Sequence, residues 1–245
     1  MKKAPIPHDE DQRIKELQSY NILDTPAEME FDEITELAAL ICGTSISLVS
    51  LVDTDRQWFK SKFGLEAPET PRDISYCGHA IHGTDIFVVE DSEKDQRFCD
   101  NPLFTKEPHV RFYAGAPLVT TKGHKLGTLC VIDQKSKRLS EFQTKALRLL
   151  ARNVVNLLEL KKRKELEAVQ AMVVTYSHEL NNPLQIAIGY IEKLKKQPDN
   201  RDALNKLDDS IVRICDVVKS IRKITESNEL EFSQYVADSK MVKTG

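Results

Sequence analysis

The sequence lacks the features that mark membrane, secreted and nucleic-acid-binding proteins. No apolar run reaches the roughly 20 residues needed to cross a bilayer. The start, M-K-K-A-P-I-P-H-D-E, has no apolar core of a signal peptide. The formal net charge of −3 leaves no basic excess for nucleic acid. We therefore expect a cytoplasmic protein that binds neither membranes nor nucleic acids.

Cysteine and glycine are also sparse. The five cysteines form no C-x-x-C pair, so we expect free thiols packed as small apolar side chains. Only nine glycines are present, and none of them builds a Gly-rich phosphate loop. The chain as given therefore has no means of binding ATP. Its 245 residues leave room for one large domain or two modest ones.

Residues 166–194 have the periodicity of a helix that buries one stripe. Apolar side chains recur there at spacings of three and four residues, at Leu166, Val169, Val173, Tyr176, Leu180, Leu184, Ala187, Ile191 and Leu194. His178 lies about 200° around the helix from the stripe residues on either side of it. We therefore expect its imidazole to point away from the stripe, although a lone surface histidine often has no role.

Three neighbours of His178 set it apart from an ordinary surface histidine. Glu179 follows it directly, and Asn182 lies one turn further along on nearly the same face. Pro183 removes the N–H that would bond the carbonyl of Glu179, so we expect a helix bend there. The string S-H-E-L-N-N-P-L at 177–184 resembles the H-box of two-component histidine kinases. In that family H-E-x-x-[TN]-P lies on the first helix of the dimerisation and histidine-phosphotransfer (DHp) domain.

The resemblance implies roles for three polar residues. His178 is the phosphoacceptor, and Glu179 is an acid or base that orients the imidazole of His178. Asn182 has two interpretations. It positions water for dephosphorylation of a response regulator, which itself carries Mg²⁺, or it is simply a polar side chain that faces water.

A second helix is predicted after a turn at 197–200, where Asp199 or Asn200 is available as N-cap. Its apolar residues again recur at spacings of three and four, at Leu204, Leu207, Ile211, Ile214, Val218 and Ile221. Two such helices cannot bury both stripes alone, so we expect a homodimer that forms a four-helix bundle. The polar segment from about Ser227 is predicted to fray, with 229–245 as a flexible tail.

The first 158 residues predict an α+β arrangement. Helices are expected at 9–20, 28–42 and 75–82, and a longer one opens with the capping box Ser140 and Gln143. Strands are expected at 45–53, 56–63, 86–90, 112–121 and 125–132, the last two joined as a hairpin. Residues 68–73 and 91–108 are expected to be irregular connectors.

Five strings in this half resemble a bacterial branch of GAF sensory domains, over about residues 20–158. They are S-L-V-D-T-D-R-Q-W-F-K-S, Y-C-G-H-A-I, R-F-C-D-N-P-L, R-F-Y-A-G-A-P-L and G-T-L-C-V-I-D. The resemblance implies a central antiparallel sheet with helices on one face and a small-molecule pocket on the other. Known GAF ligands include cyclic nucleotides, bilins, haem and small metabolites. The N-K-F-D-E pattern of the cyclic-nucleotide binders is missing here.

The candidate pocket residues are Cys77, His79, Arg111 and Tyr113, of which Arg111 and Tyr113 alternatively bridge elements of the fold. His79 and His82, three residues apart beside Cys77, leave a metal site as another alternative. Packing alone also explains Cys77. The sequence identifies no cofactor and no ligand for this half, and an empty, dimerising GAF domain is a further alternative.

The two resemblances divide the chain into a GAF domain at 1–158, a linker helix with the DHp domain at 159–228, and the tail. The charge run at 161–165 is a solvated helical face or a signalling linker that stores two packings. We expect a two-component signalling protein of the sensor histidine kinase family. In it, the GAF domain controls phosphoryl transfer to or from His178.

The expected partners follow from the same resemblance. They are the receiver domain of a response regulator and, as phosphoryl donor, a separate histidine kinase or ATP-binding domain. No autonomous kinase activity is expected. Two alternatives remain open: a non-catalytic regulatory dimer that binds a response regulator or kinase, and a fragment of a full-length histidine kinase.

Overall fold

A computed structural model describes the backbone of residues 1–197 and 199–241, with side chains over 1–197 and 199–221. The chain divides into two compact units, Met1–Arg163 and Lys164–Gly245. Each unit is described below by itself. Within the described ranges, no helix combines the length and the apolar character that a membrane span requires.

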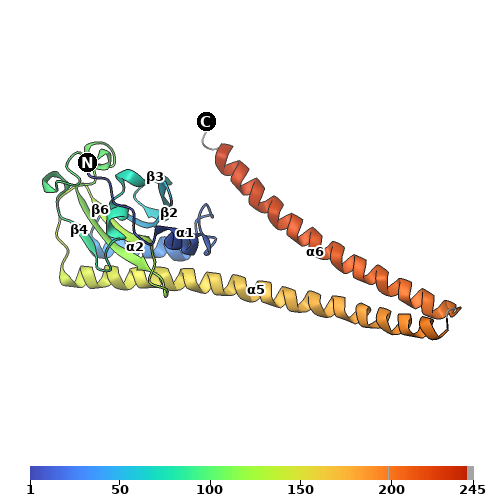
Figure 1. Cartoon of the computed structure of the whole chain (residues 1–245). Coiled ribbons are helices and arrows are strands. Elements are labelled where there is room, and N and C mark those ends of the chain that lie inside the picture. The colour runs from blue at the N-terminus through green and yellow to red at the C-terminus, as the bar shows by residue number, and fades with distance from the viewer. Residues whose placement is uncertain (198, 242–245) are drawn as a thin grey trace. The chain divides into compact units, whose positions relative to one another are not determined.

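A six-stranded antiparallel sheet forms the centre of the first unit (Figure 1). Its spatial order is β3-β2-β1-β6-β5-β4, so β3 and β4 are the edges. The strands are β1 Ile46–Val52, β2 Arg56–Phe63, β3 Glu69–Pro71, β4 Phe87–Val89, β5 Phe112–Val119 and β6 Lys125–Asp133. The α+β class and the antiparallel sheet predicted from the sequence are thereby confirmed.

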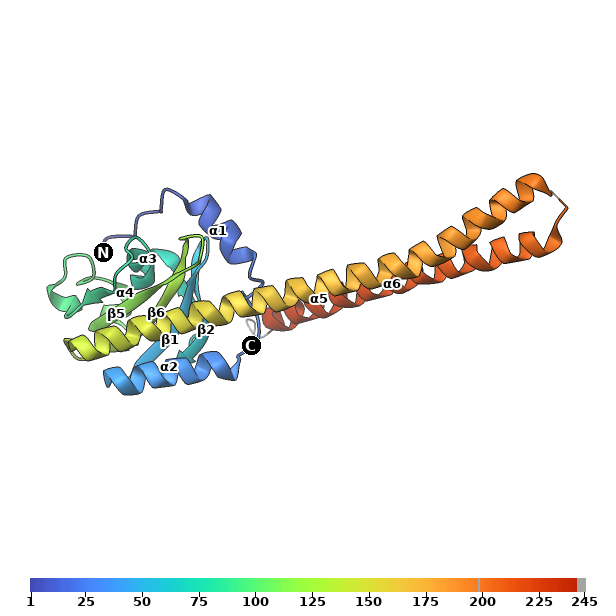
Figure 2. The same cartoon turned by 90° about the horizontal axis from the view of Figure 1, so that it is seen from below.

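Helices cover both faces of this sheet. The α-helices are α1 Glu10–Gln18, α2 Met29–Cys42, α3 Tyr76–Ala80, α4 Pro102–Thr105, α5 Glu141–Lys196 and α6 Arg201–Met241. Two 3-10 turns, η1 and η2, lie at Arg72–Ile74 and Ser92–Lys94. Figure 2 shows α2 and the first part of α5 side by side across one face, with α3 on the other.

Alternation along β1 separates two cores. Val49 and Leu51 join the core beneath α2 and α5, whereas Leu48 and Val52 join the core beneath α3. Every residue of β1 is buried, as expected for a central strand with both faces covered. The two faces of the sheet therefore have separate cores, one beneath α3 and the other beneath α2 and α5.

Two connectors expected to be irregular contain short elements. Residues 68–73 hold the edge strand β3, and 91–108 hold η2 and α4. A three-residue strand shows no readable period, so periodicity alone misses it. Helix α4 is set by local chemistry instead, because Asn101 caps the N–H of Leu103 at 2.8 Å and Pro102 occupies the first turn.

The start of α5 confirms the predicted capping box. The Ser140 hydroxyl accepts a hydrogen bond from the Gln143 N–H at 3.2 Å, and the Gln143 carboxamide oxygen accepts one from the Ser140 N–H at 2.9 Å. The helix then continues without interruption to Lys196, through the charge run at 161–165 and through Pro183.

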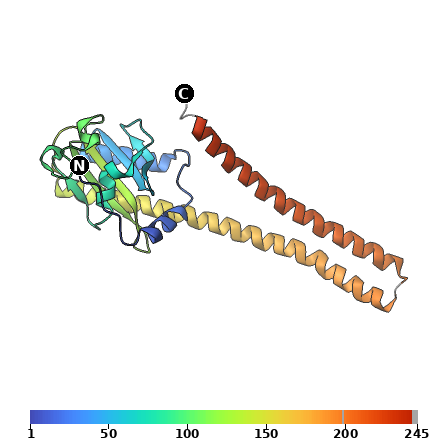
Figure 3. The ribbon, with the colours of Figure 1, turned by 45° about the horizontal axis from the view of Figure 1, so that its top comes forward.

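The second unit is a helical hairpin of the last part of α5 and α6 (Figure 3). Asn200 caps α6 by accepting from the Ala203 N–H at 3.0 Å, while Pro198 lies outside the described residues. Ala187, Ala203 and Ser210 are almost fully buried. Helix α6 reaches Met241, beyond the expected end near Ser227. The flexibility of 229–245 stays a prediction, and 242–245 lie outside the described residues.

The close pairing of β1 with β6 gives a stability prediction at Gly127. A Cβ at Gly127 would lie 1.9 Å from the Ser50 carbonyl oxygen, whereas one at Gly83 meets nothing closer than 3.9 Å. Gly127→Ala is therefore expected to lower the free energy of unfolding of this unit by more than about 2 kcal/mol. Gly83→Ala should change it by less than about 0.5 kcal/mol. Denaturant unfolding followed by fluorescence of the buried Trp58 measures both, and equal stabilities would contradict this packing.

Candidate functional site

His178 lies on the solvent-exposed face of α5 in the second unit. Its side chain is exposed, as are those of Glu179 and Asn182, while Pro183 is buried. At 100° per residue, His178 and Asn182 lie about 140° and 100° from Pro183 in the same direction. Because Pro183 lies on the buried side of α5, His178 and Asn182 both point outward on one face of the helix, as the sequence predicted.

The imidazole of His178 has no partner among the side chains that the structure describes. Within residues 1–197 and 199–221, no hydrogen bond or ion pair joins it to another side chain, Glu179 included. Nearby hydroxyls are instead satisfied by the helix, since Ser177 donates to the Val173 carbonyl at 2.7 Å. The site can therefore present a free ring nitrogen to a partner, and the orienting role of Glu179 stays a prediction.

Cys77 and Tyr113 meet in the core beneath α3. Tyr113 donates its hydroxyl to the Cys77 sulfur at 3.2 Å, and Thr128 does so at 3.1 Å. Burial raises the pKa of Tyr113 and of Cys130. At Cys77 burial acts in the same direction, but hydrogen bonds from neighbouring side chains outweigh it and lower the pKa. Since Cys77 and Tyr113 are almost fully buried, the cluster presents no open ligand site.

His79 and His82 hold the N-terminal segment against α3. The Nε2 atom of His79 lies 3.0 Å from the Lys2 carbonyl, and that of His82 lies 2.8 Å from the Pro5 carbonyl. A carbonyl only accepts, so both rings carry a proton on Nε2 and donate. The described part of the chain contains no group of three or more side chains able to hold a metal ion. In this structure His79 and His82 each bind a backbone carbonyl.

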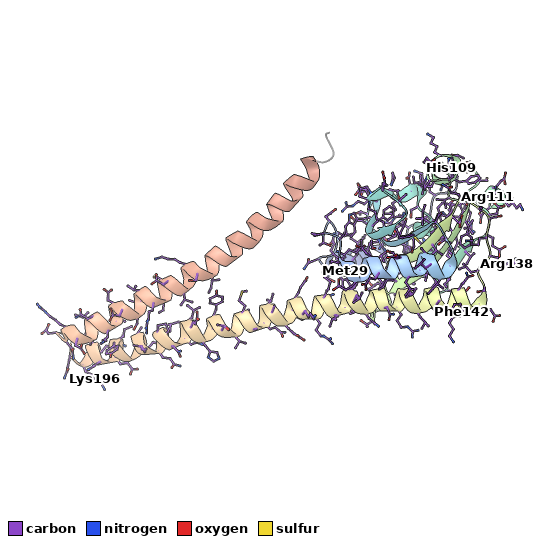
Figure 4. All side chains as sticks on the ribbon, turned by 180° about the vertical axis from the view of Figure 1, so that it is seen from behind. Met29, His109, Arg111, Arg138, Phe142 and Lys196 are labelled. Atoms are coloured by element: carbon purple, nitrogen blue, oxygen red, sulfur yellow. The ribbon has the colours of Figure 1, made fainter. Side chains whose placement is uncertain are left out.

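Arg111 lies at the β4 end of the sheet, near Arg138 (Figure 4). Its guanidinium donates to Asp91 at 2.9 Å and also pairs with Glu93. The hydrogen bond with Asp91 raises the pKa of Arg111. Of the two interpretations of Arg111, the structure therefore supports the one in which its side chain bridges elements of the fold.

A cavity of about 490 Å³ opens on the α3 face, between the sheet and α4. Most of its wall is apolar, formed by Ile46, Leu48, Phe59, Leu65, Ala67, Leu103, Pro108, Val110 and Ile132. The polar lining side chains are Ser45, Gln57, Glu66, Thr70, Glu107 and Gln134. None of the four candidate pocket residues lines this cavity. The resemblance to GAF domains predicted a pocket on one face of the sheet. The residues that line this cavity come from elements too far apart in the sequence for a local motif to predict them.

A chain of polar contacts that starts at one buried ammonium ties α5 to the sheet where α5 leaves the first unit. The ammonium of Lys60 on β2 is fully buried and donates to Thr25, to the Pro26 carbonyl and, at 2.5 Å, to Glu28. The other carboxylate oxygen of Glu28 accepts from Lys161 of α5 at 2.6 Å. Burial tends to raise the pKa of Glu28, but the hydrogen bonds from Lys161 and Lys60 lower it.

Glu159 and Lys162 continue this contact on the side of α1. Glu159 accepts from the Tyr20 hydroxyl at 2.9 Å and from the Thr121 hydroxyl at 3.0 Å. The ammonium of Lys162 donates to Ser19 at 2.6 Å and lies 4.4 Å from the centre of the Tyr20 ring. We call Glu28, Lys60, Glu159, Lys161 and Lys162 the α5 clamp. Lys161 and Lys162, the first two residues of the charge run at 161–165, therefore bind Glu28 and Ser19 of the first unit. The sequence alone also allowed the whole run to be a solvated helical face.

Comparison with protein families finds two matches along the chain. The model of the GAF domain matches residues 26–160. The model of the His Kinase A (phospho-acceptor) domain matches residues 168–229, the region that contains His178, Glu179 and Asn182. No ATPase domain is found within the 245 residues.

Individual relatives match the N-terminal part. A cyclic di-GMP phosphodiesterase of Pseudomonas aeruginosa is 43% identical over 137 residues, which are 56% of this chain and 23% of that protein. The chain thus spans about a quarter of the length of this curated relative.

Among solved structures, the GAF domain of an Acinetobacter phosphoenolpyruvate-protein phosphotransferase has a TM-score of 0.46 at 16% identity, covering 62% of this chain and 94% of that one. The PixJ GAF domain of Thermosynechococcus elongatus has a TM-score of 0.46 at 13% identity, covering 71% and 99%. At these identities the likeness concerns the fold alone.

Proposed function

We propose that this chain, which belongs to the GAF family and carries a His Kinase A phospho-acceptor domain after it, passes phosphoryl groups through His178. The two domains together support a signalling protein of the sensor histidine kinase type. The observation that carries the proposal is the exposed imidazole of His178 within the phospho-acceptor match, which has no partner among the side chains of 1–197 and 199–221. A cytoplasmic location is part of the proposal.

The acceptor step needs a neutral ring nitrogen and a phosphoryl donor. In the proposal, ATP held by a separate histidine kinase or ATP-binding domain supplies the phosphoryl group. The lone pair of a His178 ring nitrogen attacks phosphorus, a P–N bond forms, the bond to the leaving oxygen breaks, and ADP departs. A carboxylate at the other ring nitrogen fixes the tautomer, which is the role we assign to Glu179 on partner binding.

The transfer step moves the group to a response regulator. A carboxylate oxygen of the receiver-domain aspartate attacks the phosphohistidine, so that a P–O bond forms as the P–N bond breaks and His178 regains its lone pair. The Mg²⁺ of this step belongs to the partner. Asn182 lies four residues further along the same face. We propose that it orients a water molecule for in-line hydrolysis of the aspartyl phosphate, which yields carboxylate and inorganic phosphate.

A second candidate function is a regulatory dimer that binds a response regulator or kinase without passing phosphoryl groups. What favours it is that, among residues whose side chains the structure describes, no hydrogen bond joins His178 to Glu179. In this case the same exposed face serves as a docking surface. Whether His178 becomes phosphorylated distinguishes the two functions.

Dimerisation is common to both candidates. Several apolar side chains of the single hairpin remain roughly half exposed, and among them Leu184, Ile188, Ile191, Leu204, Ile211 and Val218 recur at regular helical spacings. We call them the open stripe. Their spacings of three, four and seven residues keep them on one face of each helix. A second copy that covers the open stripe completes a four-helix bundle, and this supports a homodimer.

The phosphotransfer proposal is tested by supplying a cognate histidine kinase with radiolabelled ATP. The wild-type chain and His109→Ala are expected to gain acid-labile, alkali-stable label. His178→Ala should gain none, because it lacks the nucleophile. His109 is a matched control, since its ring is also exposed. If His178→Ala is labelled like the wild type, or leaves all signalling intact, phosphoryl transfer through this residue is wrong.

The role of Asn182 is read from dephosphorylation of the regulator in the same assay. Asn182→Ala is expected to slow release of inorganic phosphate about tenfold while the labelling of His178 persists, because only the attacking water loses its partner. An unchanged rate of release would remove Asn182 from the mechanism.

The dimer is tested with two equally drastic substitutions on α6. Ile211→Glu places a charge in the open stripe, whereas Val212→Glu places it next door; the two side chains are 47% and 54% exposed in the single hairpin. Burying an unpaired carboxylate is costly, so Ile211→Glu should raise the dimer dissociation constant at least about tenfold. Analytical ultracentrifugation measures both variants. Equal effects of the two would contradict this interface.

A further inference from the structure

We propose that Cys77 and Cys130 are a redox-active thiol pair, which a peroxide oxidises to a disulfide within the first unit. Cys77 is the thiol that attacks the peroxide, and Cys130 is the thiol that completes the disulfide. Residues 2–5, which we call the strap, control access to the pair. The proposal is independent of phosphoryl transfer at His178, because that residue lies in the second unit.

The two cysteines meet on the α3 face of the sheet. Cys77 lies on α3 and Cys130 lies on β6, and both side chains are almost fully buried. The hydroxyl of Thr128 lies 3.1 Å from the Cys77 sulfur, and Cys130 is the next residue on the same face of β6. The Cys130 thiol donates a hydrogen bond to Cys77. Because a disulfide requires neighbouring sulfur atoms, this contact meets the first condition for one.

Cys77 is surrounded by hydrogen-bond donors. The hydroxyls of Tyr113 and Thr128 lie 3.2 and 3.1 Å from its sulfur. Ser50, the cross-strand neighbour of Thr128, is fully buried, and its hydroxyl has no hydrogen-bond partner within the described residues. This hydroxyl is therefore available to a thiolate at Cys77. The thiolate is the reactive form of a cysteine, and these donors stabilise it.

Cys42 shows the effect of burial when burial is the main influence on a thiol. It is equally buried, in the core beneath α2 and α5, and burial raises its pKa to about 11. At Cys77 the hydrogen bonds outweigh burial and lower the pKa, whereas burial and the contact with Cys77 raise the pKa of Cys130. The pair is therefore asymmetric, because Cys77 ionises first and Cys130 keeps its proton.

The oxidation proceeds in two balanced steps. The Cys77 thiolate attacks one oxygen of hydrogen peroxide, so that an S–O bond forms and the O–O bond breaks. The hydroxide that leaves takes up the proton lost by Cys77 and becomes water. The Cys130 sulfur then attacks the sulfur of the sulfenic acid, an S–S bond forms, the S–O bond breaks, and hydroxide leaves with the Cys130 proton as a second water. Two thiols together lose two electrons, and one peroxide gains them.

The strap packs against α3 and the turn that follows it. His79 and His82 donate to strap carbonyls at 3.0 and 2.8 Å. A Cβ at Gly78, the residue after Cys77, would lie 3.1 Å from the side chain of Ala4 in the strap. Since Cys77 is buried between this layer and the sheet, a peroxide reaches its sulfur only when the segment opens locally.

Oxidation of the wild-type chain with hydrogen peroxide tests the pair. Remaining thiols are alkylated in denaturant, the chain is digested without reduction, and disulfides are mapped by mass spectrometry. We expect a peptide that links Cys77 to Cys130, while Cys42 remains a thiol. The proposal is overturned if the pair stays reduced at peroxide concentrations that fully oxidise the exposed Cys99 and Cys215. It is also overturned if Cys42 is oxidised as fast as Cys77.

Two variants distinguish the attacking thiol from the resolving thiol. In Cys130→Ser the sulfenic acid of Cys77 has no thiol to resolve it, so dimedone should trap it. In Cys77→Ser the dimedone adduct at Cys130 should form at least about tenfold more slowly, because that thiol keeps its proton. Fluorescence of the buried Trp58 verifies that both variants are folded. Equal labelling of the two cysteines would contradict the assigned roles.

The strap is tested by the rate at which the disulfide forms. His82→Ala removes one hydrogen bond that holds the strap, so it should raise this rate about fivefold. His109→Ala is the matched control, since its ring also lies within hydrogen-bonding distance of a backbone carbonyl, that of Phe104 at 3.2 Å. This control should form the disulfide as the wild type does. Equal rates in the two variants would contradict control of access by the strap.

Discussion

The buried ammonium of Lys60 is the constraint on which the exit of α5 from the GAF domain depends. A charge removed from water is costly unless acceptors surround it. Thr25, Pro26 and Glu28 supply those acceptors. Burial lowers the pKa of Lys60, and the contact with Glu28 opposes that shift. The second carboxylate oxygen of Glu28 accepts a hydrogen bond from Lys161 of α5. The carboxylate that stabilises the buried ammonium of Lys60 therefore also binds α5.

Helix α5 is continuous from the GAF domain to the His178 site, and its two parts have different functions. Its first part closes the core beneath the sheet, with residues such as Leu147 and Val154. Its last part carries His178 and packs on α6 through positions such as Ala187. A change in the GAF cavity reaches β1, β2 and β6 directly, and β2 carries Lys60. We propose that the α5 clamp converts such a change into a shift of α5, for which couplings of about 1–3 kcal/mol are sufficient.

Local patterns predicted the elements well and long-range contacts poorly. The limits of β2, Arg56–Phe63, and the capping box at Ser140 follow from the nearest few residues, so the sequence is sufficient for them. The H-box is likewise contiguous. The pairing of Glu28 with Lys161 joins residues 133 positions apart, and the cavity lining comes from several strands and loops. The sequence marks Cys77 and Tyr113 only as candidate pocket residues, because their contact with each other joins positions 36 apart in the chain.

The most direct test of this account is hydrogen exchange along α5 in Glu28→Gln. We expect amides of residues 157–176 to exchange at least about fivefold faster than in the wild type, because the neutral amide no longer holds Lys161 and leaves Lys60 with a weaker partner. Glu30→Gln, an exposed carboxylate two residues away on α2, should leave exchange unchanged. Identical exchange along α5 in Glu28→Gln and the wild type would contradict the claim that the clamp links the sheet to the helix that carries His178.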